Sequence, residues 1–203
     1  MTAHILSFHP KTTLRWSMKY FIETLKGLTV ATVLCIAFSG YAKADAFIDV
    51  PHFQQLTPVW CWVAAAQQVI AYKKGFLNTP QQCALVEATD GASLGICCNF
   101  GHPGCVHTGN FTQVANLISY FGGSYSTYVL PANAFIIEST LQAGKPILAQ
   151  IATGGSSTHV VVIRGIKMTP TPILLINDPM APVPYEVPFI NLASIWIDGI
   201  VIN

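Results

Sequence analysis

The apolar residues of this chain change their spacing at about residue 146. Upstream of this point they recur at intervals of three and four residues, which is typical of helices, and downstream they form short β-branched runs. Val63, Ala66, Val69 and Ile70 carry the clearest helical pattern, and Gly75 follows as a stop signal. The predicted helices cover 61–74, 111–120 and 131–143.

The β-branched runs are separated by Gly-rich or Pro-rich breaks, so they predict strands that pair into an antiparallel sheet. Residues 45–53 are expected to be extended, because they contain the pair Val50-Pro51. Helices followed by a sheet indicate an α+β fold. The predicted strands cover 124–130, 146–152, 158–164, 173–177 and 196–202.

Composition directs attention to the N-terminal region. Hydrophobic residues make up 52% of the chain and charged residues 9%, which is very apolar for a soluble protein. Residues 18–44 combine a basic start, an apolar run over 28–38 and an Ala-x-Ala ending, the three parts of a secretory signal peptide. The apolar run is short for a membrane-spanning helix, which needs about 20 residues. We predict cleavage after Ala44, with an uncleaved anchor as the alternative.

The sequence therefore predicts three parts: a non-structural extension at 1–17, the signal peptide at 18–44, and one domain at 45–203, secreted or periplasmic. No stable membrane anchor is expected after cleavage. The domain has five Lys and Arg residues against eight Asp and Glu residues. Such a chain has no basic patch, which argues against nucleic acid as a partner. The oligomeric state stays open.

Five cysteines lie in the predicted mature chain: Cys61, Cys83, Cys97, Cys98 and Cys105. Setting Cys61 aside leaves an even number in an exported chain, which predicts two disulfides. A bridge between the neighbours Cys97 and Cys98 is strained, so each is expected to have a different partner, and two pairings remain open. A zinc site is the alternative, because His102 and His107 lie close by.

Cys61 lies at the predicted start of the first helix. Unpaired backbone N–H groups and the positive end of the helix dipole favour a thiolate there, and the thiolate is the nucleophilic form of cysteine. Gln55, six residues earlier, can supply an amide N–H beside the sulfur, where an oxyanion develops. The alternative is a buried structural cysteine packed between Trp60 and Trp62.

His159 follows a glycine-rich loop and begins a β-branched run. Asn177 and Asp178 end the next predicted strand, and if the two strands pair, a side chain from that end can meet the imidazole. The structural alternatives are a core histidine and, for Asp178, a turn residue before Pro179. Cysteine at a helix start, histidine on one strand and a carboxylate or amide on the next form a thiol-protease constellation.

In order and spacing these motifs resemble the papain-like cysteine peptidases over most of residues 48–200. The likeness is greatest to the compact bacterial branch typified by the AvrRpt2 effector and the peptidase-C39-like proteins. It implies a papain-like fold, with an N-terminal helical half whose central helix starts at the nucleophile and a C-terminal antiparallel sheet. The implied nucleophile is Cys61, which forms an ion pair with His159.

The resemblance also implies the remaining site residues. Asp178 is the third triad member, with Asn177 as the fallback, and Gln55 forms the oxyanion hole with the Cys61 backbone N–H, with Gln54 as the alternative. The implied activity is hydrolysis of peptide or protein substrates without cofactor or metal. A transglutaminase-like or deamidating enzyme and a non-catalytic papain-fold binding module are the alternatives.

The sequence departs from papain at two places. Pro58 stands where papain has a cysteine three residues before its nucleophile, so that bridge is absent. About ten residues separate Asp45 from Gln55, which leaves no room for an inhibitory propeptide after the predicted cleavage.

Overall fold

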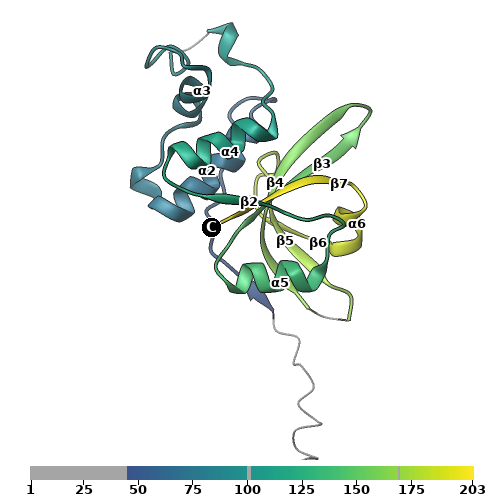
Figure 1. Cartoon of the computed structure of the whole chain (residues 1–203). Coiled ribbons are helices and arrows are strands. Elements are labelled where there is room, and N and C mark those ends of the chain that lie inside the picture. The colour runs from purple at the N-terminus through teal and green to yellow at the C-terminus, as the bar shows by residue number, and fades with distance from the viewer. Residues whose placement is uncertain (1–44, 100–101, 169) are drawn as a thin grey trace, which may run out of the picture. The chain divides into compact units, whose positions relative to one another are not determined.

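In the part of the chain that the structure describes, the short strand β1 (Ala46–Phe47) is followed by a mainly helical part and then by most strands of the sheet (Figure 1). This computed structural model describes residues 45–99, 102–168 and 170–203. The predicted extension and signal peptide lie outside these residues. Within them, none of the helices has the length and apolar character needed to cross a membrane.

Helix α2 is the centre of the helical part. It packs against α3, α4 and strand β4, and all of its residues from Trp62 to Ala71 are buried. Its run of alanines allows these neighbours to approach closely, because alanine is a strong helix former with a small side chain. The helices are α2 (Cys61–Lys74), α3 (Gln82–Asp90), α4 (Phe111–Tyr120), α5 (Ala134–Gln142) and α6 (Phe189–Ala193), with 3-10 turns η1 (Phe76–Asn78) and η2 (Pro103–Cys105).

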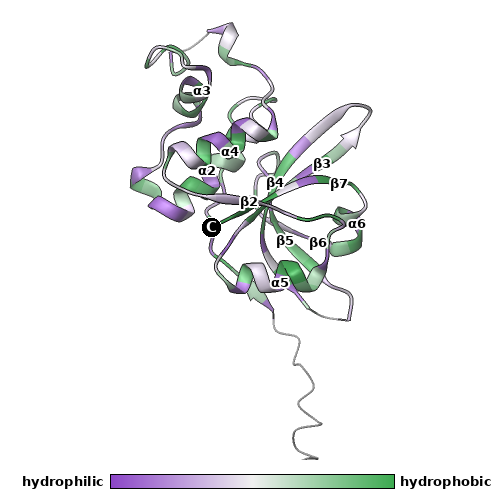
Figure 2. Cartoon of the chain, in the orientation of Figure 1, coloured by the Kyte–Doolittle hydropathy of each residue, from purple (hydrophilic) through white to green (hydrophobic). Residues whose placement is uncertain are grey.

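The described strands form one antiparallel sheet in the order β2-β7-β3-β4-β5-β6, with β1 paired to β4. Figure 2 shows hydrophobic residues along the middle of this sheet and paler colours at the tip of the β3–β4 hairpin. The strands are β1 (Ala46–Phe47), β2 (Tyr125–Thr127), β3 (Ile147–Gly154), β4 (Ser157–Lys167), β5 (Ile173–Asn177), β6 (Tyr185–Pro188) and β7 (Trp196–Ile202).

Alternate residues of β4 face two different hydrophobic clusters. Val160 and Val162 pack in the cluster that contains α2, α3 and α4, whereas Val161 and Ile163 pack in the cluster that contains α5 and α6. Side chains on a strand point alternately to its two faces, so a continuous apolar run suits a strand covered on both sides. The core therefore has two layers, and β4 lies between them.

The α+β fold class is confirmed. Helices α2 and α4 have the predicted bounds, whereas α5 begins three residues after the predicted Pro131. The reason is Asn133, whose side chain accepts hydrogen bonds from the backbone N–H groups of Phe135 and Ile136 and so caps the helix. Strand β1 lies within the extended segment predicted at 45–53, whereas the sequence patterns did not predict α3, α6 or β6.

Among the described residues, the four cysteines other than Cys61 form disulfides Cys83–Cys98 and Cys97–Cys105. The neighbours Cys97 and Cys98 have different partners, as predicted, and the structure selects one of the two open pairings. Because the four sulfurs are bonded in two pairs, no thiolate is left among them to bind zinc, and the alternative zinc site at these cysteines is not formed.

A buried carboxylate organises the loop that carries these disulfides. Glu87 of α3, only 2% exposed, accepts hydrogen bonds from the backbone N–H groups of Gly95 (2.9 Å), Cys97 (2.7 Å) and Cys98 (3.2 Å). The bond from Gly95 contributes most to lowering the pKa of Glu87 below 4.5, and burial opposes it. The folded state therefore favours the charged carboxylate.

We expect Glu87→Gln to lower the melting temperature at neutral pH, because the amide is a weaker acceptor than the carboxylate. A lowered pKa contributes stability that is present above the ordinary pKa of glutamate and is lost as acid protonates the group. The variant should therefore lose less stability than the wild type between neutral pH and about pH 3. Calorimetric melting curves over this range, with Glu138→Gln as the control, measure both effects; equal acid sensitivity would contradict them.

Candidate active site

Cys61 is the first residue of α2 and is partly exposed, while Trp60 and Trp62 beside it are buried. The two indole N–H groups point away from the sulfur and donate to backbone carbonyls, that of Trp60 to Cys105 (3.0 Å) and that of Trp62 to His107 (3.4 Å). Cys61 is the free cysteine of the described residues. The thiol thus lies at an accessible helix N-terminus that two buried tryptophans fix in place.

His159, the third residue of β4, lies between Cys61 and Asp178. Its Nε2 atom is 2.6 Å from Asp178 Oδ1, and its ring also forms a hydrogen bond with the Cys61 side chain. Since Nε2 faces the carboxylate, Nδ1 is the nitrogen left for the sulfur. The three side chains come from the start of α2, the start of β4 and the end of β5, which α2–β4 packing and β4–β5 pairing bring together.

The surroundings of His159 favour its charged form. Burial opposes protonation, but hydrogen bonds with Asp178 and Cys61, and then the charges of these groups, raise the pKa of His159 to about 9. Burial also opposes ionisation of Asp178. The hydrogen bond with His159 outweighs it, together with bonds from the Met180 N–H and the Tyr185 hydroxyl, and lowers the pKa of Asp178. The pair is therefore an imidazolium and a carboxylate at neutral pH.

Asn177 has a different place. Its side chain is fully buried, and its Nδ2 donates to the backbone carbonyls of Val50 (2.9 Å) and Pro51 (3.3 Å). The sequence left open whether Asn177 or Asp178 faces His159. In the structure Asp178 contacts His159, whereas Asn177 is hydrogen-bonded to the segment that leads towards Gln55.

Gln55 lies in a loop that is bonded to the Asp178 turn. Its backbone N–H donates to the Pro179 carbonyl (2.9 Å), and its side-chain Nε2 donates to the Thr57 carbonyl (2.9 Å). The Nε2 group has two N–H bonds, so one remains after Thr57 is bound. Gln55 is not among the residues that line the cleft at Cys61. Gln54, the alternative, is exposed and turns its carbonyl towards Gln82.

A cleft of about 510 Å³ opens at Cys61 and His159. One wall comes from the β3–β4 hairpin, including Gln150 and Thr158, and the opposite side includes Trp62. Among its described lining residues there is no Asp, Glu, Lys or Arg side chain. The cleft therefore suits an uncharged stretch of substrate next to the sulfur.

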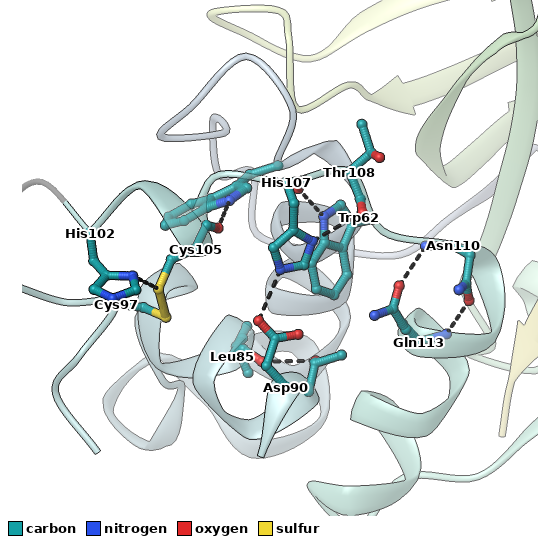
Figure 3. Close-up of polar contacts among 12 residues, drawn as sticks. Trp62, Leu85, Asp90, Cys97, His102, Cys105, His107, Thr108, Asn110 and Gln113 are labelled. Atoms are coloured by element: carbon teal, nitrogen blue, oxygen red, sulfur yellow. Dashed lines mark hydrogen bonds and ion pairs between the residues drawn. A yellow bond between two sulfur atoms is a disulfide. The ribbon is translucent and has the colours of Figure 1, made fainter. Parts of the chain in front are cut away.

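Thr108 and Gly109 also line the cleft, and their position depends on His107 (Figure 3). The His107 ring stacks on Trp62 with centroids 5.9 Å apart, and its nitrogens contact the Thr108 carbonyl (3.0 Å) and Asp90 Oδ2 (2.9 Å). The Thr108 carbonyl first, and then Asp90, raise the pKa of His107. A Cβ atom on Gly109 would collide with the Trp62 indole, so the backbone packs directly on that ring.

The family model described as "Peptidase_C39 like family" matches residues 47–198, which is most of the chain. The protein belongs to the Peptidase_C39-like family. No curated protein matches the sequence significantly. Within this family, the papain-like arrangement expected from the sequence is the one that the described helices and antiparallel sheet adopt.

Two solved structures have the same fold. The peptidase domain of Streptococcus ComA, a bi-functional ABC transporter involved in a quorum sensing pathway, is 12% identical with a TM-score of 0.54, and the alignment covers 75% of this chain and 96% of that one. A double glycine motif protease from an AMS/PCAT transporter, in complex with the leader peptide, is 19% identical with a TM-score of 0.50, covering 77% and 91%.

Two residues at the site escaped sequence reasoning. The Tyr185 hydroxyl donates to Asp178 Oδ2 (3.0 Å); burial, and then the Asp178 charge, raise the pKa of Tyr185 to about 12. A ring nitrogen of His52 lies 3.0 Å from the Asp178 carbonyl oxygen. Tyr185 lies in β6, opposite Ile176 of β5. A prediction that β5 and β6 form a hairpin across the proline-rich stretch between them would have placed Tyr185 near Asp178.

The His159 ring should titrate with an apparent pKa of about 9 in the wild type. Asp178→Asn removes the carboxylate that stabilises the imidazolium, so the pKa should fall towards 6.5. Because the pKa of His159 is higher in the folded state, protonation of this group stabilises the fold. The contribution to the free energy of unfolding is complete below about pH 6.5 and is lost as the pH rises through 9. NMR titration of the imidazole protons of the wild type and of Asp178→Asn measures the shift. An unchanged pKa in Asp178→Asn would contradict the pairing.

Proposed function

We propose that this protein is an exported cysteine peptidase that cleaves peptide bonds through an acyl-enzyme. The observation that carries the proposal is His159, which contacts the free thiol of Cys61 on one side and Asp178 on the other. Membership of the Peptidase_C39-like family supports the reaction class. In this proposal Cys61 is the nucleophile, His159 the acid and base, and Asp178 the residue that orients and charges the imidazole.

The chemical steps follow from this geometry. The Cys61 thiolate attacks the scissile carbonyl carbon, and the carbonyl oxygen takes the negative charge. His159 donates a proton to the leaving amine as the C–N bond breaks, which leaves a thioester on Cys61. His159 then takes a proton from water as the water oxygen attacks the thioester; the C–S bond breaks, the carboxylic acid is released, and the Cys61 thiolate and the protonated imidazole are restored. No metal or cofactor takes part in these steps.

We assign the oxyanion hole to the Gln55 side chain and the Cys61 backbone N–H. The loop that carries Gln55 is bonded to the Asp178–Pro179 turn, and Gln55 Nε2 keeps one N–H after binding Thr57. The first N–H groups of α2 have no partner within the helix, as at any helix start. Gln54 stays the alternative donor in this proposal.

The substrate in this proposal is a peptide or protein. One similar structure is a double glycine motif protease in complex with a leader peptide, which supports a peptide substrate here. The cleft has no Asp, Glu, Lys or Arg side chain among its described lining, so the residues next to the scissile bond should be uncharged.

Export, the signal peptide and the domain limits at residue 45 belong to the proposal as well. Two disulfides are compatible with an oxidising compartment such as the periplasm or the medium. Kinship with AvrRpt2-type effectors within the papain-like peptidases remains a prediction from the motifs.

Cys61→Ala should abolish peptide hydrolysis by the purified protein, because the thioester cannot form. An epoxide thiol inhibitor should block the wild type and add its mass to Cys61 alone, since the other described cysteines are in disulfides. Hydrolysis of a mixed peptide library, followed by mass spectrometry, measures activity and sites together. Circular dichroism of Cys61→Ala is the folding control.

Full activity in Cys61→Ala would reject the assignment. Ammonia release or cross-linking from glutamine substrates without peptide cleavage would instead favour the deamidating or transglutaminase-like alternative. Peptide binding without any turnover would favour the non-catalytic module.

The pH dependence of kcat/KM should be bell-shaped. The proposed mechanism needs an anionic nucleophile and a protonated imidazole at the same time, so both acid and base should lower the rate. Base removes the His159 proton, and activity should therefore fall on the alkaline side near pH 9. Asp178→Asn should move this alkaline limb to lower pH, because it lowers the pKa of the imidazolium. Initial rates from pH 4 to 10 at constant ionic strength give the profile, and a profile with one limb would count against the ion pair.

A further inference from the structure

Three buried glutamine side chains lie beneath the loop that carries Gln55. Gln67 and Gln68 belong to α2 and Gln82 is the first residue of α3; they are 9%, 0% and 2% exposed. Buried amides are costly unless they are hydrogen-bonded, so their partners show what they are for. The sequence patterns indicate no role for any of the three.

Gln82 holds the loop on both sides of Gln55. Its Nε2 donates to the Gln54 carbonyl (2.7 Å), and its Oε1 accepts from the Leu56 N–H (2.9 Å). A single side-chain amide therefore replaces two backbone partners that the irregular loop lacks. The position of the Gln55 Cα is fixed between two bonded neighbours.

The other two glutamines support this arrangement from α2. Gln82 Nε2 also donates to Gln67 Oε1 (3.1 Å), and Gln67 Nε2 donates to the Pro80 carbonyl (2.8 Å), on the segment that leads into α3. Gln68 Nε2 donates to the Phe53 carbonyl (3.0 Å). Gln67 thus orients Gln82, and none of the hydrogen bonds of the described residues joins Gln67 directly to residues 54–56.

Covalent chemistry fixes the start of α3. Cys83, the residue after Gln82, is bonded to Cys98, and Glu87 one turn later binds the same loop. These links join α3 to the loop that follows it, while the Gln82–Gln67 hydrogen bond and helix packing hold its N-terminal turn against α2. Gln82 therefore presents its amide to the loop from a fixed support.

We propose that Gln82 is a positioning residue for the oxyanion hole, acting through Gln55 by holding the backbone at Gln54 and Leu56. The inference rests on the proposed function, since it gives Gln55 the oxyanion. A donor aimed at the oxyanion is effective only when it is held in place before the charge develops, so loss of the support should lower kcat more than it raises KM.

The test compares kcat and KM of the full-length chain for a peptide that the wild type cleaves. Gln82→Met keeps the length of the side chain and removes both hydrogen bonds to the loop. Removing an oxyanion donor outright costs about a hundredfold or more in kcat, so Gln55→Ala should lose about a hundredfold and Gln82→Met about tenfold. KM should change less than about twofold in Gln82→Met, because ground-state binding is retained.

A double-mutant cycle separates positioning from general destabilisation. If Gln82 acts through Gln55, then Gln82→Met should cost less than about twofold in the Gln55→Ala background. Tyr72→Phe is the control: it removes a side-chain hydrogen bond from α2 to a backbone carbonyl, that of Gly144, but no bond to Gln82 or to residues 54–56, so kcat should stay within about threefold of the wild type even where the melting temperature falls.

Different failures have different meanings. A tenfold loss that persists in the Gln55→Ala background, or an equal loss in Tyr72→Phe, overturns the positioning role. Full activity in Gln55→Ala overturns it together with the oxyanion assignment of Gln55, while the nucleophile assignment stands on the Cys61→Ala result. If the wild-type chain cleaves no peptide and is not labelled at Cys61, the proposed function itself fails.

Discussion

The candidate site depends on the packing of α2 against β4. Cys61 is the first residue of α2 and His159 is near the start of β4, so their side chains can meet only while these two elements stay in contact. Buried apolar residues on both elements hold that contact in one hydrophobic cluster. Alanines in the first turns of α2 keep the distance short, since larger side chains would push the strand away. A layer of ordinary core packing thus sets the geometry of the reactive groups.

Around this core, side chains replace the backbone partners that loops lack. Trp60 and Trp62 donate to carbonyls of the disulfide-bearing segment, Asn177 to those at residues 50 and 51, and Gln82 to the carbonyl of Gln54. A buried backbone carbonyl must have a donor, and in irregular segments the donor has to come from a side chain. The loops beside Cys61 are therefore fixed by long-range hydrogen bonds, although they have no regular secondary structure.

The described cysteines are in two chemical states. Four form disulfides in one loop system, which Glu87 also binds, and Cys61 keeps its thiol at a helix start beside an imidazolium. The nucleophilic chemistry that we propose for Cys61 requires a sulfur without a disulfide partner. Here the other four described sulfurs are bonded in two pairs, which leaves Cys61 as the free thiol of the described residues.

Local sequence determined the features that depend on neighbours along the chain. The bounds of α2 and α4, the cysteine at a helix start and the β-branched strands follow from helical periodicity, stop signals and capping, which act within one or two turns. Tertiary structure alone decided the rest. Asn177 and Asp178 are adjacent, but only the β4–β5 register and the loop after it determine that Asp178 reaches His159. The disulfide pairing, helix α3 and the role of Gln82 likewise depend on groups distant in sequence, whose contacts arise from the folded packing and leave no periodic pattern in the chain.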